Sequence, residues 1–297
     1  MTTQEKVGHF SSCAGATKWS DEERKARIEL AATYRMVALM GWDELIYNHL
    51  TIRIPGTEHI LLNPFGLRFD EVTASSLVKL DLDGNLIDEG STTYGFNRTG
   101  YVIHGAIHRA RPDINATLHT HHASIVAVSS LKCGLVHFHQ NSFLFGEVAY
   151  HDYEGISTDI DEQKRIVAAL GPTSKNLILR NHGVVSCGST IQEAFFYLYQ
   201  VTKSCEVQIQ ALSACGGDVS KLNIPTKEIS DKSFRISSQF NVEGVGMKEW
   251  DCLIRKLDKL DPSYKFIDES RPYNIGTLKD SDRLISMLIS ALESRSS

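Results

Sequence analysis

The feature that most constrains this chain is a short alternating segment that ends in closely spaced histidines. Residues 114–121 alternate between apolar and polar side chains, which is the pattern of a strand whose two faces differ. His119 and His121 then share one face, because successive side chains of a strand point to opposite sides. The side chains of the opposite parity are expected to face the core, and they are Ile114, Ala116 and Leu118.

Two imidazoles on one face of a strand favour a metal ion. As ordinary half-buried residues they would each need a separate polar partner, whereas one ion satisfies both. His182 is the best third ligand, because it lies between two apolar strand segments and Gly183 lets the backbone turn close to a ligand. Three protein ligands and one open position are typical of catalytic zinc. We therefore predict zinc at His119, His121 and His182, with iron and manganese as alternatives, since imidazole binds all three.

Two further histidine pairs are weaker candidates for ligands. His104 and His108 are four apart on a predicted helix, but no glutamate lies between them, so we interpret them as core or surface residues. His137 and His139 repeat the His-x-His spacing, yet no third ligand follows them at a strand turn.

Cap and turn signals outline the remaining elements. Capping boxes at Ser20/Glu23 and Thr190/Glu193 open two predicted helices. Helices are expected at 20–41, 100–110, 123–131, 159–170 and 190–214. Strands are expected at 50–54, 59–62, 78–82, 114–121, 144–150, 176–180 and 184–187. Interleaved hairpins and helices predict an α/β fold, with a mixed sheet whose faces are covered by helices.

The chain is expected to have three parts. Residues 1–19 are polar without periodicity and predict a flexible tail, and residues 20–215 form the metal-binding domain. Residues 216–297 are expected to hold a linker or surface arm at 216–245, followed by helices marked by Trp250 and Leu288.

Composition narrows the class of partner. The chain of 297 residues is 42% hydrophobic and 23% charged, with a net charge of −5 and a pI of about 6.2, and this balance argues against nucleic acid. No apolar run reaches the ~18 residues of a membrane span, and no signal peptide is visible. Six cysteines without a Cys-x-x-Cys pair predict reduced thiols in the cytoplasm.

Two stretches together resemble the class II aldolase/adducin superfamily, over roughly residues 28–212. They are IHRARPDINATLHTHH at 107–122 and LRNHGVVSCGSTIQEAF at 179–195. The family includes fuculose- and rhamnulose-phosphate aldolases and the N-terminal head domain of adducin. The resemblance implies a three-layer α/β/α sandwich around a mixed, mainly antiparallel sheet, with a C-terminal helical extension and assembly as a homo-oligomer, a tetramer. The family's zinc-binding histidines correspond to His119, His121 and His182.

Other family positions are kept unevenly. Asn48 matches an asparagine that binds the substrate's phosphate or carboxylate, whereas Phe65 replaces a phosphate-binding hydroxyl. Gly100 stands where the aldolases have a glutamate that acts as general acid and base near the metal. These departures place the chain nearer the adducin-like branch.

The resemblance therefore leaves three functions open. The first is a metal-dependent lyase that stabilises an enediolate of a small, anionic hydroxy-carbonyl or sugar-phosphate-like substrate. The second is a non-catalytic adducin-like module for self-association or for a cytoskeletal or other protein partner, and the third is an Fe(II) oxygenase. The predicted substrate-binding residues are Asn48, Arg98 and Thr99. Tyr153 is the predicted catalytic proton shuttle, with His122 and Glu147 as alternatives.

Overall fold

The computed structural model describes residues 18–155, 160–240 and 242–268. Its centre is an eight-stranded sheet in the order β4-β3-β2-β1-β5-β8-β7-β6, antiparallel throughout except for the pair β6 and β7. The strands are β1 His49–Arg53, β2 His59–Leu62, β3 Val78–Asp81, β4 Leu86–Asp88, β5 Ala116–Thr120, β6 Val148–His151, β7 Asn176–Leu179 and β8 Gly183–Gly188. The helices are α1 Asp21–Leu39, α2 Arg98–Ala110, α3 Ala123–Ser129, α4 Ile160–Leu170, α5 Ile191–Ala214, α6 Lys227–Phe240 and α7 Met247–Leu260.

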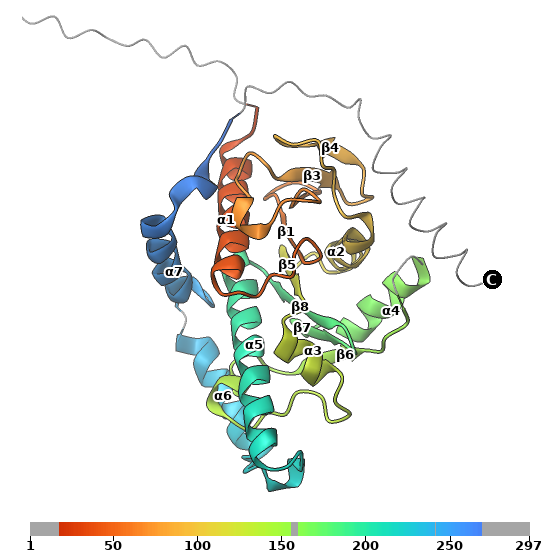
Figure 1. Ribbon diagram of the computed structural model, residues 1–297, viewed down its shortest axis with the longest axis vertical. Helices are drawn as coiled ribbons and strands as arrows, with labels where there is room; N and C mark the ends of the chain where they lie inside the picture. Colours follow the sequence, from red (N-terminus) through yellow and green to blue (C-terminus); the bar gives the residue numbers. More distant parts are fainter. Residues whose placement is uncertain (1–17, 156–159, 241, 269–297) are drawn as a thin grey trace, which may run out of the picture.

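Helices cover both faces of the sheet (Figure 1). α1 and α5 pack on one face over the largest apolar core, while α2 and α4 pack on the other. α4 also connects the parallel strands β6 and β7, as a crossover between parallel strands requires. These layers confirm the predicted α/β/α sandwich with a mixed, mainly antiparallel sheet.

Strand β5 lies in the middle of the sheet, between β1 and β8, and both of its faces are buried. Ala116 and Leu118 belong to the core under α1 and α5, as predicted. Ile114 was wrongly expected to join them, since it packs in the cluster of Ile103 and Ile107 on the α2 side. The regular strand begins only at Ala116, so the alternation of side chains does not extend back to Ile114.

Helix α6 lies within the segment that the sequence predicted to be a linker or arm. Its Phe234 approaches Gly146, whose φ of 71° places the backbone in the left-handed region that favours glycine. The described side chains of α6 are exposed or half-buried, although apolar residues such as Ile229 and Ile236 recur along it at helical spacing.

The next helix, α7, packs on the domain itself. Its Trp250 is buried with its ring centroid 6.1 Å from that of Phe195 in α5. The helix expected around Leu288 lies outside the described residues. Within the described ranges, no helix combines the length and apolarity needed to cross a bilayer.

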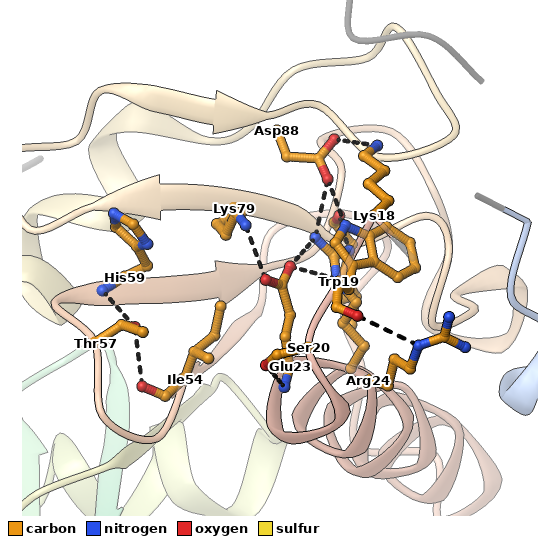
Figure 2. A network of polar contacts seen from close by, with 12 residues as sticks. Lys18, Trp19, Ser20, Glu23, Arg24, Ile54, Thr57, His59, Lys79 and Asp88 are labelled. Atoms are coloured by element: carbon orange, nitrogen blue, oxygen red, sulfur yellow. Dashed lines mark hydrogen bonds and ion pairs between the residues drawn. The ribbon is translucent and has the colours of Figure 1, made fainter. Parts of the chain in front are cut away.

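A buried ionic network fixes the start of α1 to the edge of the sheet (Figure 2). Arg27 is fully buried and pairs with Glu23 at 2.9 Å and with Asp88 at 3.2 Å. Asp88 also accepts hydrogen bonds from Lys18 Nζ and Trp19 Nε1, each at 2.9 Å. Lys18 and Trp19 were assigned to the tail from sequence, but Trp19 is buried against this network. Their role depends on Asp88, 69 residues away from Trp19, which no local pattern reveals.

Replacing Asp88 by Asn should strongly destabilise the fold. The change leaves the guanidinium of Arg27 buried beside a weaker counter-charge, and breaking a buried pair in this way typically costs about 3–5 kcal/mol. Urea unfolding followed by circular dichroism measures the loss. Asp70→Asn is the control, because Asp70 pairs with Arg68 on the surface, where no measurable change is expected. Equal stability of the two variants would contradict this account of the network.

Candidate metal centre and its cavity

Strand β5 and the turn between β7 and β8 bring three imidazoles together. His119 lies in β5, His121 follows that strand, and His182 lies in the β7–β8 turn. One potential ligand nitrogen from each lies within 4.8 Å of the other two. Gly183 is required at this turn, because a Cβ there would lie 2.5 Å from the carbonyl oxygen of Thr120. The three predicted ligands therefore form one cluster.

Hydrogen bonds on the far sides of two of these rings determine their tautomers. His119 Nδ1 lies 2.9 Å from the carbonyl oxygen of Val184, and His121 Nδ1 lies 2.7 Å from Glu44 Oε2. Carbonyl and carboxylate oxygens only accept, so both Nδ1 atoms carry a hydrogen, and in the neutral form of each ring Nε2 carries the lone pair. These Nε2 atoms are 2.7 Å apart. Two acceptors so close repel each other unless a cation or a proton lies between them, so this arrangement fits a divalent metal.

His119 and His182 are held in the protonation state that metal binding needs. Burial, and after it the neighbouring imidazoles, lowers the pKa of His119 well below its usual range and the pKa of His182 to about 4. At pH 7 these rings are therefore neutral, and only the neutral imidazole offers a lone pair to a metal.

Glu44 is a residue of this site that the sequence did not reveal. It lies in the loop between α1 and β1, lines the cavity beside the histidines and accepts from His121. A carboxylate in this position orients a metal-binding histidine and makes it a better donor. Glu44 is 77 residues from His121 in sequence, so only the folded chain shows the pairing.

Behind the cluster, a chain of buried side chains runs from β1 into α2. His108 Nδ1 donates to the carbonyl oxygen of Ile114 at 3.2 Å, so its Nε2 accepts from Thr51 Oγ1 at 2.9 Å. Thr51 Oγ1 in turn accepts from His104 Nδ1 at 2.7 Å, and His104 Nε2 accepts from His49 Nδ1 at 2.7 Å. His49 Nε2 is left as an acceptor, and His49 lines the cavity. The buried positions of His104 and His108 agree with the core alternative given for them.

His49 also explains the glycine at position 100. A Cβ on Gly100 would lie 2.3 Å from His49 Cδ2 and 2.4 Å from its Nε2. The His49 ring, held by His104, therefore occupies the space that a side chain at position 100 would need. A glutamate cannot be restored there unless the His49 ring moves.

The cavity in front of the cluster has a volume of about 530 Å³, and only some of the predicted substrate-binding and catalytic residues line it. Thr99 and Tyr153 line it. Arg98 instead lines a second cavity of about 240 Å³, where its guanidinium lies 5.3 Å from the ring centroid of Phe96. Asn48 lies outside the cavity wall, and its buried amide has no hydrogen-bond partner.

The alternative proton shuttles and the rival histidine pair lie outside the cavity lining. His122 shares a hydrogen bond with Ser124, and the exposed Glu147 lies 3.5 Å from Lys227. His137 and His139 do not belong to any group of three potential metal ligands among the described residues. The structure thus leaves Tyr153 as the one sequence-predicted proton shuttle that lines the cavity.

Comparison with known proteins assigns the chain to a family. The family model described as Class II Aldolase and Adducin N-terminal domain matches residues 28–209. The chain belongs to this family. Alpha-adducin of Rattus norvegicus is 43% identical over 246 residues, which cover 80% of this chain but only 34% of the adducin. The chain thus spans about a third of the length of that relative.

Two solved structures resemble this member of the family along most of their length. An aldolase II superfamily protein from Pseudomonas syringae has a TM-score of 0.77 and 42% identity, covering 84% of this chain and 98% of the other. An L-fuculose 1-phosphate aldolase from Glaciozyma antarctica has a TM-score of 0.71 and 31% identity, covering 82% and 92%. The family therefore contains both adducins and aldolases that resemble this chain.

Replacing Glu44 by Gln should weaken metal binding without unfolding the protein. Gln keeps the size of the side chain but removes the charge that orients His121, and loss of such a partner typically lowers metal affinity about 10–100-fold. Competition with a chromophoric chelator measures the dissociation constant. Asp43→Asn is the matched control, because Asp43 is the adjacent acid and does not line the cavity. Unchanged affinity in Glu44→Gln would show that the carboxylate has no such role.

Replacing Gly100 by Ala should destabilise the protein only while His49 is present. The added methyl group collides with the His49 ring, and overpacking of this kind costs about 1–3 kcal/mol. In a His49→Ala background the same change should be neutral or stabilising, since alanine favours helices over glycine. Urea unfolding of the four proteins gives the coupling energy. Additive effects would contradict the steric account.

Proposed function

We propose that the chain is a metal-dependent lyase-type enzyme, which acts on a small anionic hydroxy-carbonyl compound or a similar sugar phosphate. The observation that carries the proposal is the pair of Nε2 lone pairs on His119 and His121, 2.7 Å apart and adjacent to His182. Superfamily membership supports it, since class II aldolases are typically metal dependent. Zinc is the proposed ion, and iron or manganese would suit the same imidazoles.

The residues of this chain can hold and orient the reacting groups. A divalent ion at the three histidines supplies a Lewis acid that polarises a carbonyl and stabilises developing negative charge. The Val184 carbonyl and Glu44 hold two of the rings in position. Thr99 and Tyr153 place hydroxyl groups at the cavity wall, where they can bind an anionic substrate or carry a proton. The Nε2 atom of His49 adds a hydrogen-bond acceptor, because the hydrogen bond between His49 Nδ1 and His104 fixes the tautomer of the His49 ring.

Substrate choice should differ from that of the sugar-phosphate aldolases. Gly100 stands at the position of the aldolases' acid–base glutamate, and the His49 ring fills the space beside Gly100. A proton must therefore move through other groups, and a positioned acid or base is typically worth about 10²–10⁴ in rate. We propose little or no cleavage of fuculose or rhamnulose phosphates, even with the metal site filled.

A non-catalytic adducin-like module is the second candidate. The 43% identity to alpha-adducin favours it, although this chain spans only a third of that protein. Such a module would keep the fold and the metal while binding a further copy of itself or another protein. In either case we propose a homo-oligomer, a tetramer, in the cytoplasm, where the five free cysteines of the described residues would stay reduced.

Exchange of substrate protons with solvent separates the two functions. The metal-loaded protein is incubated in deuterated water with a panel of hydroxy-ketone phosphates and hydroxy-keto acids. It should catalyse the exchange of deuterium into the position next to the carbonyl of at least one of these compounds, and mass spectrometry measures the exchange. His119→Ala should lose both the metal and the exchange. His59→Ala is the control, because His59 lies in β2 and does not line the cavity.

Two outcomes would count against the enzyme. Exchange by the metal-free protein at the same rate would contradict the metal-dependent chemistry. A fully metal-loaded protein without exchange on any compound would favour the binding module.

A further inference from the structure

A second group of potential ligands lies on another wall of the same cavity. His151 ends β6, Glu154 follows in the loop, and Glu162 lies in the first turn of α4. One imidazole nitrogen and one oxygen from each carboxylate lie within 4.8 Å of one another, and all three residues line the cavity. None of them belongs to the three-histidine cluster.

The imidazole of this group has a buried nitrogen without a hydrogen-bond partner. His151 is 8% exposed, and its Nε2 makes no hydrogen bond. The nearest charged atom is Glu162 Oε1 at 3.9 Å, which is too long for a hydrogen bond. The backbone of His151 is fixed by pairing with Leu179 and by accepting from Arg180 N at 2.8 Å. A buried polar atom held in place without a partner points to a ligand.

The carboxylate of Glu162 is also poorly compensated. Glu162 is 8% exposed, and among the residues that the structure describes its ionic neighbour within 4.0 Å is His151. Glu154 is paired with Arg165, whose side chain is 47% exposed. Two carboxylates and one imidazole thus converge, and Glu162 is a buried carboxylate beside an imidazole that makes no hydrogen bond to it. Burying a carboxylate is costly unless a positive charge compensates it, so the group favours a further cation.

We propose that His151, Glu154 and Glu162 bind a second divalent cation, separate from the ion of the three histidines. One imidazole and two carboxylates suit Mn²⁺ or Zn²⁺ and are less suited to Mg²⁺ or Ca²⁺, which prefer oxygen ligands alone. The second ion would give the cavity two positive centres for an anionic ligand. The site does not depend on the proposed lyase activity.

Metal stoichiometry tests the proposal. The full-length protein is stripped with a chelator, reloaded with Zn²⁺ or Mn²⁺, desalted, and analysed by plasma mass spectrometry, with calorimetry for affinity. We expect two equivalents in the wild type for at least one of these ions. His151→Ala and Glu162→Gln should each bind one equivalent, at the three histidines. His119→Ala should also bind one equivalent, at His151, Glu154 and Glu162. Glu147→Gln is the control, because this exposed carboxylate does not line the cavity, and it should keep both equivalents.

Several results would overturn the second site. One equivalent in the wild type that disappears in His119→Ala but persists in His151→Ala would place all binding at the three histidines. Two equivalents in a folded Glu162→Gln would exclude these ligands, as would binding at the second site only above millimolar concentration. If the wild type binds a single equivalent of metal and the pH–rate profile loses one limb in His151→Ala, then His151 and Glu162 form an acid–base pair instead of a metal site. Circular dichroism checks folding, and Glu162→Gln keeps the test valid if His151→Ala does not fold.

Discussion

The structure depends on one constraint, the close approach of two imidazole nitrogens that both carry lone pairs. His119 Nε2 and His121 Nε2 lie 2.7 Å apart because the Val184 carbonyl and Glu44 hold the opposite nitrogen of each ring as a donor. Three elements meet to produce this geometry: the central strand β5, the neighbouring strand β8, and the loop after α1. The fold therefore brings together two groups that repel unless a cation joins them.

The same constraint extends into the layer behind the sheet. His49 and His104 continue the row of imidazoles from the cavity into α2, and each hydrogen bond of that row fixes the tautomer of the next ring. This row fills the space beside Gly100, so the missing glutamate and the presence of His49 are two parts of one steric arrangement. The three-histidine cluster is therefore present beside a wall that His49 and Gly100 shape, and this separates the question of metal binding from that of aldolase chemistry.

The cluster of three histidines and most of the sheet could be predicted from sequence, because they depend on short-range periodicity. Alternation in β5 places His119 and His121 on one face, and a glycine turn marks His182. Glu44 and His151 could not be found in this way, because their partners are distant in sequence or adjacent only in the folded cavity. Arg98 was predicted because its charge could neutralise an anionic substrate. A helix turns successive side chains by about 100°, however, and Arg98 lines a different cavity from Thr99. Helix α6 was missed although its apolar residues recur at helical spacing, because the segment is polar overall and its described side chains are exposed or half-buried.

The most direct test of the account is to locate the metal by anomalous X-ray diffraction from crystals of the zinc-loaded protein. The account predicts an anomalous peak bound by Nε2 of His119 and His121 and by His182, at N–metal distances of about 2.0–2.1 Å. It also predicts that Glu44 and the Val184 carbonyl still hold the opposite nitrogens. Crystals in which zinc binds elsewhere, while His119 and His121 share only a proton, would contradict the central claim.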